Sequence, residues 1–182
     1  MSDVSETREV RLLVNGCEVV RNVAVRRLLA DFLREDLGLT ATRLACEHGV
    51  CGACTVIVDG KPVFSCLVPV SAVGSRPVRT VEGLGTPQKP SVLQKAFIDS
   101  QAAQCGYCIA GMIMRAQALL DVRPGATEAE IREHMQPNLC RCGTHMRIVA
   151  AIVAASKSLH SGPQARTAAT PHAIAAGQGD QA

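Results

Sequence analysis

The chain has 182 residues and a formal net charge of +3, a length that suits one domain of average size or two small ones. Hydrophobic residues make up 47% of it but aromatic residues only 2%, so any core must be aliphatic. The slight basic excess and the scarcity of aromatic rings argue against a nucleic-acid partner, because stacking on bases needs such rings. No apolar run approaches the roughly 20 residues that a membrane span requires.

The polar N-terminal stretch MSDVSETREV has no apolar signal core. It predicts a cytoplasmic location, unless a partner holds the chain at a membrane or carries it through an export route. Nine cysteines are an odd number, and cytosolic thiols stay reduced, so a disulfide framework is disfavoured. Clustered cytosolic cysteines indicate metal binding instead.

The first half of the chain predicts a small mixed sheet crossed by one helix. Residues 8–24 have strand composition on both sides of Asn15-Gly16, the strongest two-residue hairpin signal. Apolar residues at helical spacing in 26–38 predict a helix that ends at Gly38. Residues 55–58 and 63–68 predict a second hairpin, and 76–84 a further strand. We assign 1–82 to this first domain.

The composition of the sequence changes at 83–90, where a Gly- and Pro-rich segment predicts a linker. Residues 91–160 then predict an all-helical domain of about four helices, an estimate from apolar periodicity and capping signals such as Ser91 and the Thr127–Glu130 box. Residues 161–182 show no apolar period, and we expect a disordered tail there.

Four cysteines of the first half, called here the N-terminal thiol set, are spaced C-x4-C-x2-C-x11-C: Cys46, Cys51, Cys54 and Cys66. This is the plant-type pattern for a [2Fe–2S] cluster, which needs four thiolates, two for each iron. Gly49 and Gly52 let the loop turn sharply around a compact inorganic core. Zinc also accepts four thiolates, but its sites usually combine two short C-x2–4-C knuckles, which makes zinc the weaker interpretation.

The other four, called the C-terminal thiol set, are the pairs Cys105-x2-Cys108 and Cys140-x-Cys142. Each pair precedes a predicted helix, whose N-terminal dipole favours thiolates. A C-x-C pair converges with difficulty on one small ion, whereas a two-iron core gives neighbouring thiolates more room. Spacing alone therefore favours a metal cluster, with zinc left open.

The segments CEHGVCGACTV (46–56), QCGYCIAGMIM (104–114) and PNLCRCGT (137–144), together with Cys66, resemble the iron–sulfur subunit of the molybdenum hydroxylases. This is the xanthine dehydrogenase/aldehyde oxidoreductase family, and the resemblance covers about residues 8–157. It implies an α+β fold, with an N-terminal β-grasp ferredoxin-like domain followed by an all-α four-helix domain, each with one [2Fe–2S] cluster. The Gly143-Thr144 sequence after Cys142 departs from the C-T-G-Y of many members and is closer to the isoquinoline, nicotinate and aldehyde dehydrogenase branch.

The resemblance also implies roles and partners. Gln104 matches a residue that contacts the pterin, and Cys142 matches a ligand whose sulfur faces it. The molybdopterin cofactor would belong to a large partner subunit, and a flavin (FAD) subunit or cytochrome c would accept the electrons. The chain itself shows no paired carboxylates, Ser/His/Asp arrangement or nucleotide-binding glycine loop. We therefore expect an electron-transfer subunit of an oxidoreductase without substrate chemistry of its own; a stand-alone two-cluster ferredoxin and a zinc-stabilised interaction module are the alternatives.

Overall fold

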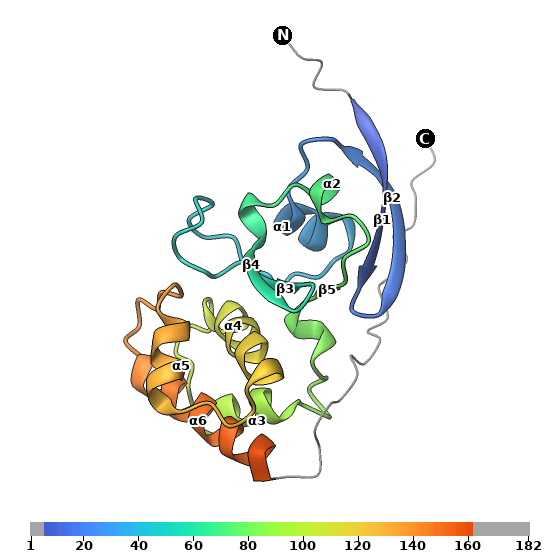
Figure 1. Cartoon of the computed structure of the whole chain (residues 1–182). Coiled ribbons are helices and arrows are strands. Elements are labelled where there is room, and N and C mark those ends of the chain that lie inside the picture. Colours follow the sequence, from blue (N-terminus) through green and yellow to red (C-terminus); the bar gives the residue numbers. More distant parts are fainter. Residues whose placement is uncertain (1–5, 162–182) are drawn as a thin grey trace.

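The computed structural model describes residues 6–161, so the predicted tail lies outside the described residues except for Ser161. Figure 1 shows the sheet and its short helices above the helices of the second half of the chain. The strands are β1 (Thr7–Val14), β2 (Cys17–Ala24), β3 (Thr55–Val58), β4 (Lys61–Phe64) and β5 (Val78–Arg79). The helices are α1 (Leu29–Asp31), α2 (Val70–Val73), α3 (Val92–Asp99), α4 (Ile109–Val122), α5 (Glu128–Met135) and α6 (His145–Ser161). Within residues 6–161, no helix is long and apolar enough to cross a bilayer.

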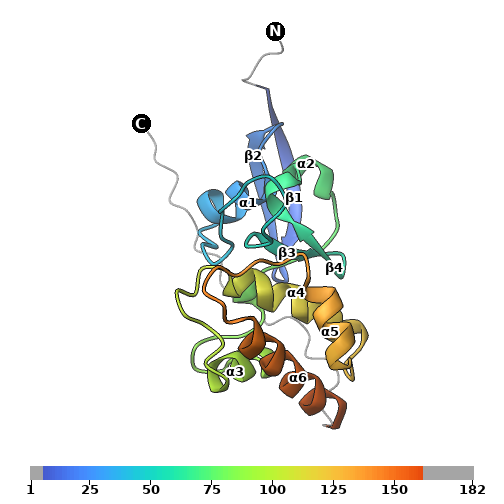
Figure 2. The same ribbon diagram turned by 90° about the vertical axis from the view of Figure 1, so that its left-hand side faces the viewer.

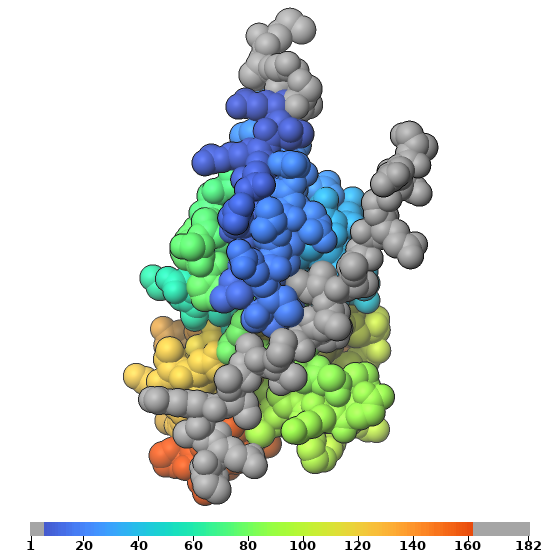
Figure 3. Space-filling view, turned by 90° about the vertical axis from the view of Figure 1, so that its right-hand side faces the viewer, coloured from blue at the N-terminus to red at the C-terminus, as the bar shows by residue number. Residues whose placement is uncertain are grey.

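The strands form a mixed sheet in the order β2-β1-β5-β3-β4, in which β1 and β5 run parallel and the other neighbours antiparallel. The predicted first hairpin is confirmed, with Val14 opposite Cys17. Asn15 and Gly16 both have positive φ, 50° and 82°, as a two-residue turn matched to strand twist requires. The outer face of this hairpin dominates the upper half of the side seen in Figure 3.

The predicted helix at 26–38 is shorter than expected. It begins at Leu29 as α1 and continues as a π-helical turn, Phe32–Asp36, in which the Leu37 N–H donates to the Phe32 carbonyl. Gly38 has φ +68°, so the predicted stop is confirmed. This segment and α2, which the sequence did not predict, cover one face of the sheet and fill a largely aliphatic core that includes Phe32.

The second hairpin is also shorter than predicted, and Cys66 lies after it rather than on its second strand. The strand β4 ends at Phe64, and Ser65–Leu67 form a 3₁₀ turn that carries Cys66. The Ser65 hydroxyl and N–H both donate to the Cys54 carbonyl, at 2.7 and 3.3 Å. Strand pairing therefore ends at Phe64, and the following turn directs Cys66 toward Cys54. The predicted strand at 76–84 is reduced to β5, followed by a 3₁₀ turn at Val81–Gly83.

The predicted helices of the second half are confirmed. Both α3 and α5 begin with complete capping boxes, Ser91 with Gln94 and Thr127 with Glu130. The four helices enclose a second aliphatic core, separate from the first, around side chains such as Met112, Ile131 and Ile152. The chain therefore combines a ferredoxin-like α+β unit with a helical unit, as Figures 1 and 2 show.

Helix α4 joins the two units because both of its faces are buried. Met112, Ala116 and Leu120 belong to the helical core, whereas Met114 and Ala118 pack on Ile57 of β3. Every residue of β3 is buried, because the strand lies between the first core and α4. Arg79 at the end of β5 also forms an ion pair with Asp121 of α4.

Candidate metal centres

The N-terminal thiol set lies on the loop between the first helical segment and β3 and on the following 3₁₀ turn. Glu47, Gly49 and Gly52 have positive φ values of 56°, 72° and 74°, so the loop reverses direction repeatedly. The backbone N–H groups of His48 and Val50 donate to the Cys46 sulfur. A loop that wraps its own amides around a sulfur offers the N–H···S contacts that a cluster ligand needs.

The four sulfurs of this set group two by two. Cys46 lies within hydrogen-bonding reach of Cys51, and Cys54 lies within reach of Cys66. Cys54 and Cys66 are both buried, with 3% of their surface exposed, and pack with Ala30. In a [2Fe–2S] cluster each iron takes two thiolates, so two pairs of sulfurs are the donor set that this cluster requires.

The C-terminal thiol set shows the same grouping between segments far apart in sequence. The sulfurs of Cys105 and Cys142 are 3.4 Å apart, and Cys108 lies within hydrogen-bonding reach of Cys140. As predicted, each pair precedes a helix: Cys105 and Cys108 precede α4, and Cys140 and Cys142 precede α6. The eight cysteines of the two sets therefore fit two [2Fe–2S] clusters, four thiolates to each. Between residues 6 and 161, no three His, Cys, Asp or Glu side chains lie close enough to hold a single metal ion.

Burial and hydrogen bonding set the thiols apart in acidity. Donation from the His48 and Val50 amides lowers the pKa of Cys46 to about 6. Burial raises the pKa of Cys54 to about 12, and that of Cys108 to about 12 as well. Burial also acts against ionisation of Cys140, but the Thr144 hydroxyl and nearby amides outweigh it and lower its pKa to about 7. At neutral pH the buried thiols of Cys54 and Cys108 therefore keep their protons, and binding a metal there would release them.

The two sets are joined directly by the segment before Cys140. The Leu139 N–H donates to the Cys51 carbonyl at 2.9 Å, and the Asn138 amide donates to the Gly52 carbonyl at 2.9 Å. Asn138 is almost fully buried, with 1% of its surface exposed. The phenol of Tyr107 donates to the carbonyl of Leu44. Figure 2 looks onto the side of the molecule where these loops meet.

Sequence reasoning did not identify Asn138 or Tyr107 as part of this junction. Their contacts reach across 86 and 63 residues, and neither residue type carries a spacing signal. Gly111 was missed for the same reason. A Cβ there would lie 2.2 Å from the Gly52 carbonyl oxygen, so only glycine lets α4 approach the loop this closely.

The predicted pterin-facing residues lie together at the surface. Gln104 is exposed and precedes Cys105, which is also exposed. The sulfur contact between Cys105 and Cys142 places the second predicted pterin-facing residue beside them.

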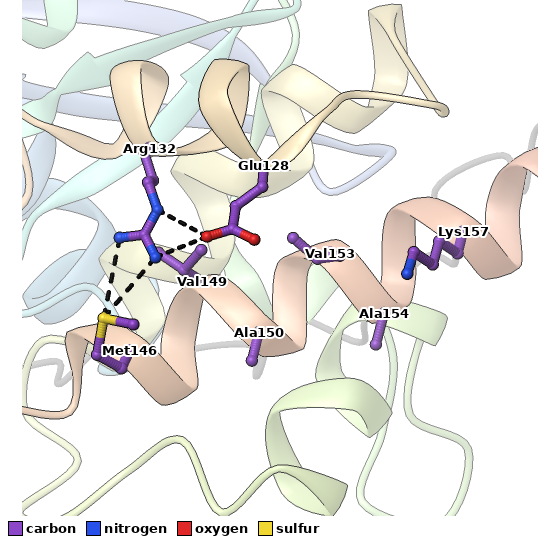
Figure 4. A pocket seen from close by; sticks show the side chains of 8 residues that line it. All are labelled: Glu128, Arg132, Met146, Val149, Ala150, Val153, Ala154 and Lys157. Carbon is purple, nitrogen blue, oxygen red and sulfur yellow. Dashed lines mark hydrogen bonds and ion pairs between the residues drawn. The ribbon is translucent and has the colours of Figure 1, made fainter.

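A groove of about 380 Å³ lies elsewhere, along α5 and α6 (Figure 4). Its floor is aliphatic, with Val149 and Val153, and one wall carries the Arg132–Glu128 ion pair. The Met146 sulfur contacts the same guanidinium. No cysteine lines the groove, so it is separate from both thiol sets.

Known proteins share these features over most of the chain. Residues 25–104 match the family described as 2Fe-2S iron-sulfur cluster binding domain, and residues 80–153 match the [2Fe-2S] binding domain family. The small FeS subunit of nicotinate dehydrogenase from Eubacterium barkeri is 47% identical over 127 residues, 70% of this chain and 80% of that protein. The alpha subunit of isoquinoline 1-oxidoreductase from Brevundimonas diminuta is 45% identical over 149 residues, 81% of this chain and 97% of that protein.

The fold is shared as well. The crystal structure of quinoline 2-oxidoreductase from Pseudomonas putida 86 matches with a TM-score of 0.81 and 40% identity, over 87% of this chain and 99% of the matched chain. Two iron–sulfur domains, two sets of paired thiols and relatives of this identity agree with one another. The chain therefore carries two [2Fe–2S] clusters and belongs to the family of iron–sulfur small subunits of the molybdenum hydroxylases.

Proposed function

We propose that this chain relays electrons within a cytoplasmic, multi-subunit molybdenum hydroxylase that oxidises an N-heteroaromatic compound or an aldehyde. The N-terminal thiol set would hold one [2Fe–2S] cluster and the C-terminal thiol set the other. When bound, the clusters accept and pass on electrons one at a time. The chain's own residues hold the two clusters close together and expose one end to a donor and another to an acceptor.

The observation that carries this proposal is the hydrogen bond between the Leu139 N–H and the Cys51 carbonyl. Cys51 is a proposed ligand of one cluster, and Leu139 is bonded to Cys140, a proposed ligand of the other. The two metal sites are thus connected through backbone atoms and one 2.9 Å hydrogen bond. A relay needs its two centres close together, and this contact holds the two proposed sites close, whereas two independent structural metal sites need no such proximity.

The surface around the C-terminal thiol set suits a large partner. Tyr107 and Leu139 expose 47% and 58% of their surface, although one is aromatic and the other apolar. Scattered exposed apolar residues are ordinary, but Tyr107 lies two residues from Cys105 and Leu139 directly precedes Cys140, so both flank the C-terminal thiol set. We assign this side to the molybdopterin-binding subunit, with Gln104 and Cys142 facing the pterin.

The N-terminal thiol set would then serve the next carrier. Val50, inside the cysteine loop, exposes 62% of its surface, and Leu67, next to Cys66, exposes 55%. We assign this end to a flavin subunit or a cytochrome c.

The test is purification of the tagged chain from its native cell without oxygen. We expect about four irons per chain, two for each cluster, and a large chain that brings molybdenum with it. Adding an N-heteroaromatic or aldehyde substrate should then produce two reduced-cluster EPR signals. Four irons without a molybdenum-containing partner would instead indicate a stand-alone ferredoxin, and zinc in place of iron would refute both cluster assignments.

A further inference from the structure

Thr144 occupies a special place beside the C-terminal thiol set. It directly precedes His145, the first residue of α6, and its carbonyl accepts the Ile148 N–H at 3.0 Å, as at the start of a helix. Its side chain is buried, with 4% of the residue exposed. The hydroxyl oxygen lies 3.3 Å from the Cys140 sulfur. A buried hydroxyl is therefore held against a proposed iron ligand.

The chemistry of the site decides the direction of this hydrogen bond. A cysteine that binds iron is a thiolate and has no proton to donate, so Thr144 must be the donor. A hydroxyl has one proton and two lone pairs, so donation to sulfur leaves the lone pairs available to N–H groups of the first helical turn. Thr144 can thus cap the N-terminus of α6 and donate a hydrogen bond to the Cys140 sulfur at the same time.

Apart from the thiol of Cys108, itself a proposed iron ligand that would have no proton when it binds iron, the other donors to this sulfur belong to the backbone. The N–H groups of Cys142 and Thr144 are directed at Cys140. Side-chain substitution cannot remove them, whereas it can remove the hydroxyl. The hydroxyl is therefore the part of this arrangement that sequence change can tune.

A donor at a ligand sulfur acts on the reduction potential of the cluster. Reduction adds a negative charge that spreads onto the sulfurs, and a hydrogen bond to an ionised acceptor strengthens as that charge grows. The effect is larger in a buried site, where the local dielectric is low. The donor thus stabilises the reduced cluster more than the oxidised one.

From this geometry we infer that Thr144 is a positioning residue that raises the reduction potential of the C-terminal cluster through its hydroxyl hydrogen bond to Cys140. The inference rests on the proposed assignment of Cys140 as an iron ligand. By this means the chain stabilises the reduced state of the C-terminal cluster. Thr144 stands where the common C-T-G-Y pattern has glycine, and the hydroxyl contact with Cys140 offers a reason for that departure.

The test compares Thr144→Val, which keeps the shape but removes the hydroxyl, with Thr144→Ser, which keeps the hydroxyl. Each purified complex is titrated redox-potentiometrically while the two reduced-cluster EPR signals are recorded. In Thr144→Val we expect the reduction equilibrium of the C-terminal cluster to weaken about tenfold, a fall of ~59 mV for a one-electron couple. The N-terminal cluster should keep its potential, and Thr144→Ser should stay close to the wild type.

Ser156→Ala is the matched control, because it removes a buried hydroxyl within α6 that donates to the carbonyls of Pro124 and Ala126. It should leave both potentials unchanged. Unchanged potentials in Thr144→Val, or an equal shift in both clusters, would overturn the inference. Cys140→Ser distinguishes a wrong ligand assignment from a wrong role for Thr144. If Cys140→Ser removes no EPR signal, the assignment of Cys140 as an iron ligand is wrong. If it removes one signal but Thr144→Val leaves the potential unshifted, only the role of Thr144 is refuted.

A measurement on the wild type keeps the inference testable if Thr144→Val does not assemble. After brief exchange into D₂O, pulsed EPR of the C-terminal cluster should detect a rapidly exchanged, strongly coupled deuteron, because hydroxyl protons exchange faster than buried helical amides. Its absence would contradict the hydrogen bond.

Discussion

Replacing Gly111 with alanine tests whether α4 is pressed directly onto the first cysteine loop. A Cβ at this position would lie 2.2 Å from the carbonyl oxygen of Gly52 and 2.9 Å from that of Ala53. Both oxygens belong to the backbone, so no change of rotamer relieves the overlap. Ordinary van der Waals contact begins at 3.4 Å, so α4 or the loop must retreat by about 1.2 Å.

The magnitude follows from two opposing effects. Overpacking costs about 1–3 kcal/mol, and the upper half of that range applies where the partner atoms cannot turn away. Alanine returns about 1 kcal/mol, because it is the better helix former. We expect a net loss of about 1–2 kcal/mol in the free energy of unfolding. For a chain of this size that lowers the midpoint of thermal unfolding by about 3–6 °C.

The assay is thermal unfolding of wild type and variant at one scan rate, followed by far-ultraviolet circular dichroism. The magnetic interaction between the two reduced clusters, seen by EPR, should weaken in parallel, because Gly52 lies between two proposed ligands of the first cluster. Gly38→Ala is the control: Gly38 has φ +68° with nothing within 4 Å of its Cβ position. It should cost about 1–2 kcal/mol by backbone strain without changing the magnetic interaction. A Gly111→Ala midpoint equal to or above the wild type would refute the contact.

Three further changes probe other parts of the chain. Cys142→Ser should remove one of the two reduced-cluster EPR signals and leave the other, because we assign each thiol set to its own cluster; two unchanged signals would contradict the ligand assignment. Deleting residues 162–182 should leave the iron content unchanged, because both cores and both thiol sets lie within 6–161; loss of iron would show that the tail is needed. Burial, helped by Arg115, lowers the pKa of His134, whose ring nitrogen lies 3.0 Å from the Arg115 carbonyl. The unfolded chain therefore takes up a proton that the folded chain refuses, so stability should fall as the pH drops below about 6.5. Unfolding midpoints at about pH 7.5 and about pH 5.5 should differ less in His134→Gln, and an equal difference would refute this account.

Local signals predicted much of the secondary structure correctly. Asn15-Gly16 forms its turn, Thr127 and Glu130 form their capping box, and α3 begins after the predicted cap Ser91. These features depend on interactions between residues a few positions apart, so sequence contains their cause. The errors arose where distant packing overrides propensity, as in the π-helical turn after α1 and the early end of β4.

The sequence by itself determined which cysteines are the candidate iron ligands, because cysteine spacing sets how a loop can surround a cluster. It also determined which face of α4 is buried in the helical core, because apolar residues recur on that face at helical spacing. Only the tertiary structure decided that the second face of α4 packs on β3 and that the Leu139 N–H donates to the Cys51 carbonyl. It also decided that the backbone of Gly52 packs closely against Gly111, where a larger residue would not fit. These contacts join segments dozens of residues apart. They depend on how two separately formed cores are oriented against each other, and no local pattern encodes that orientation.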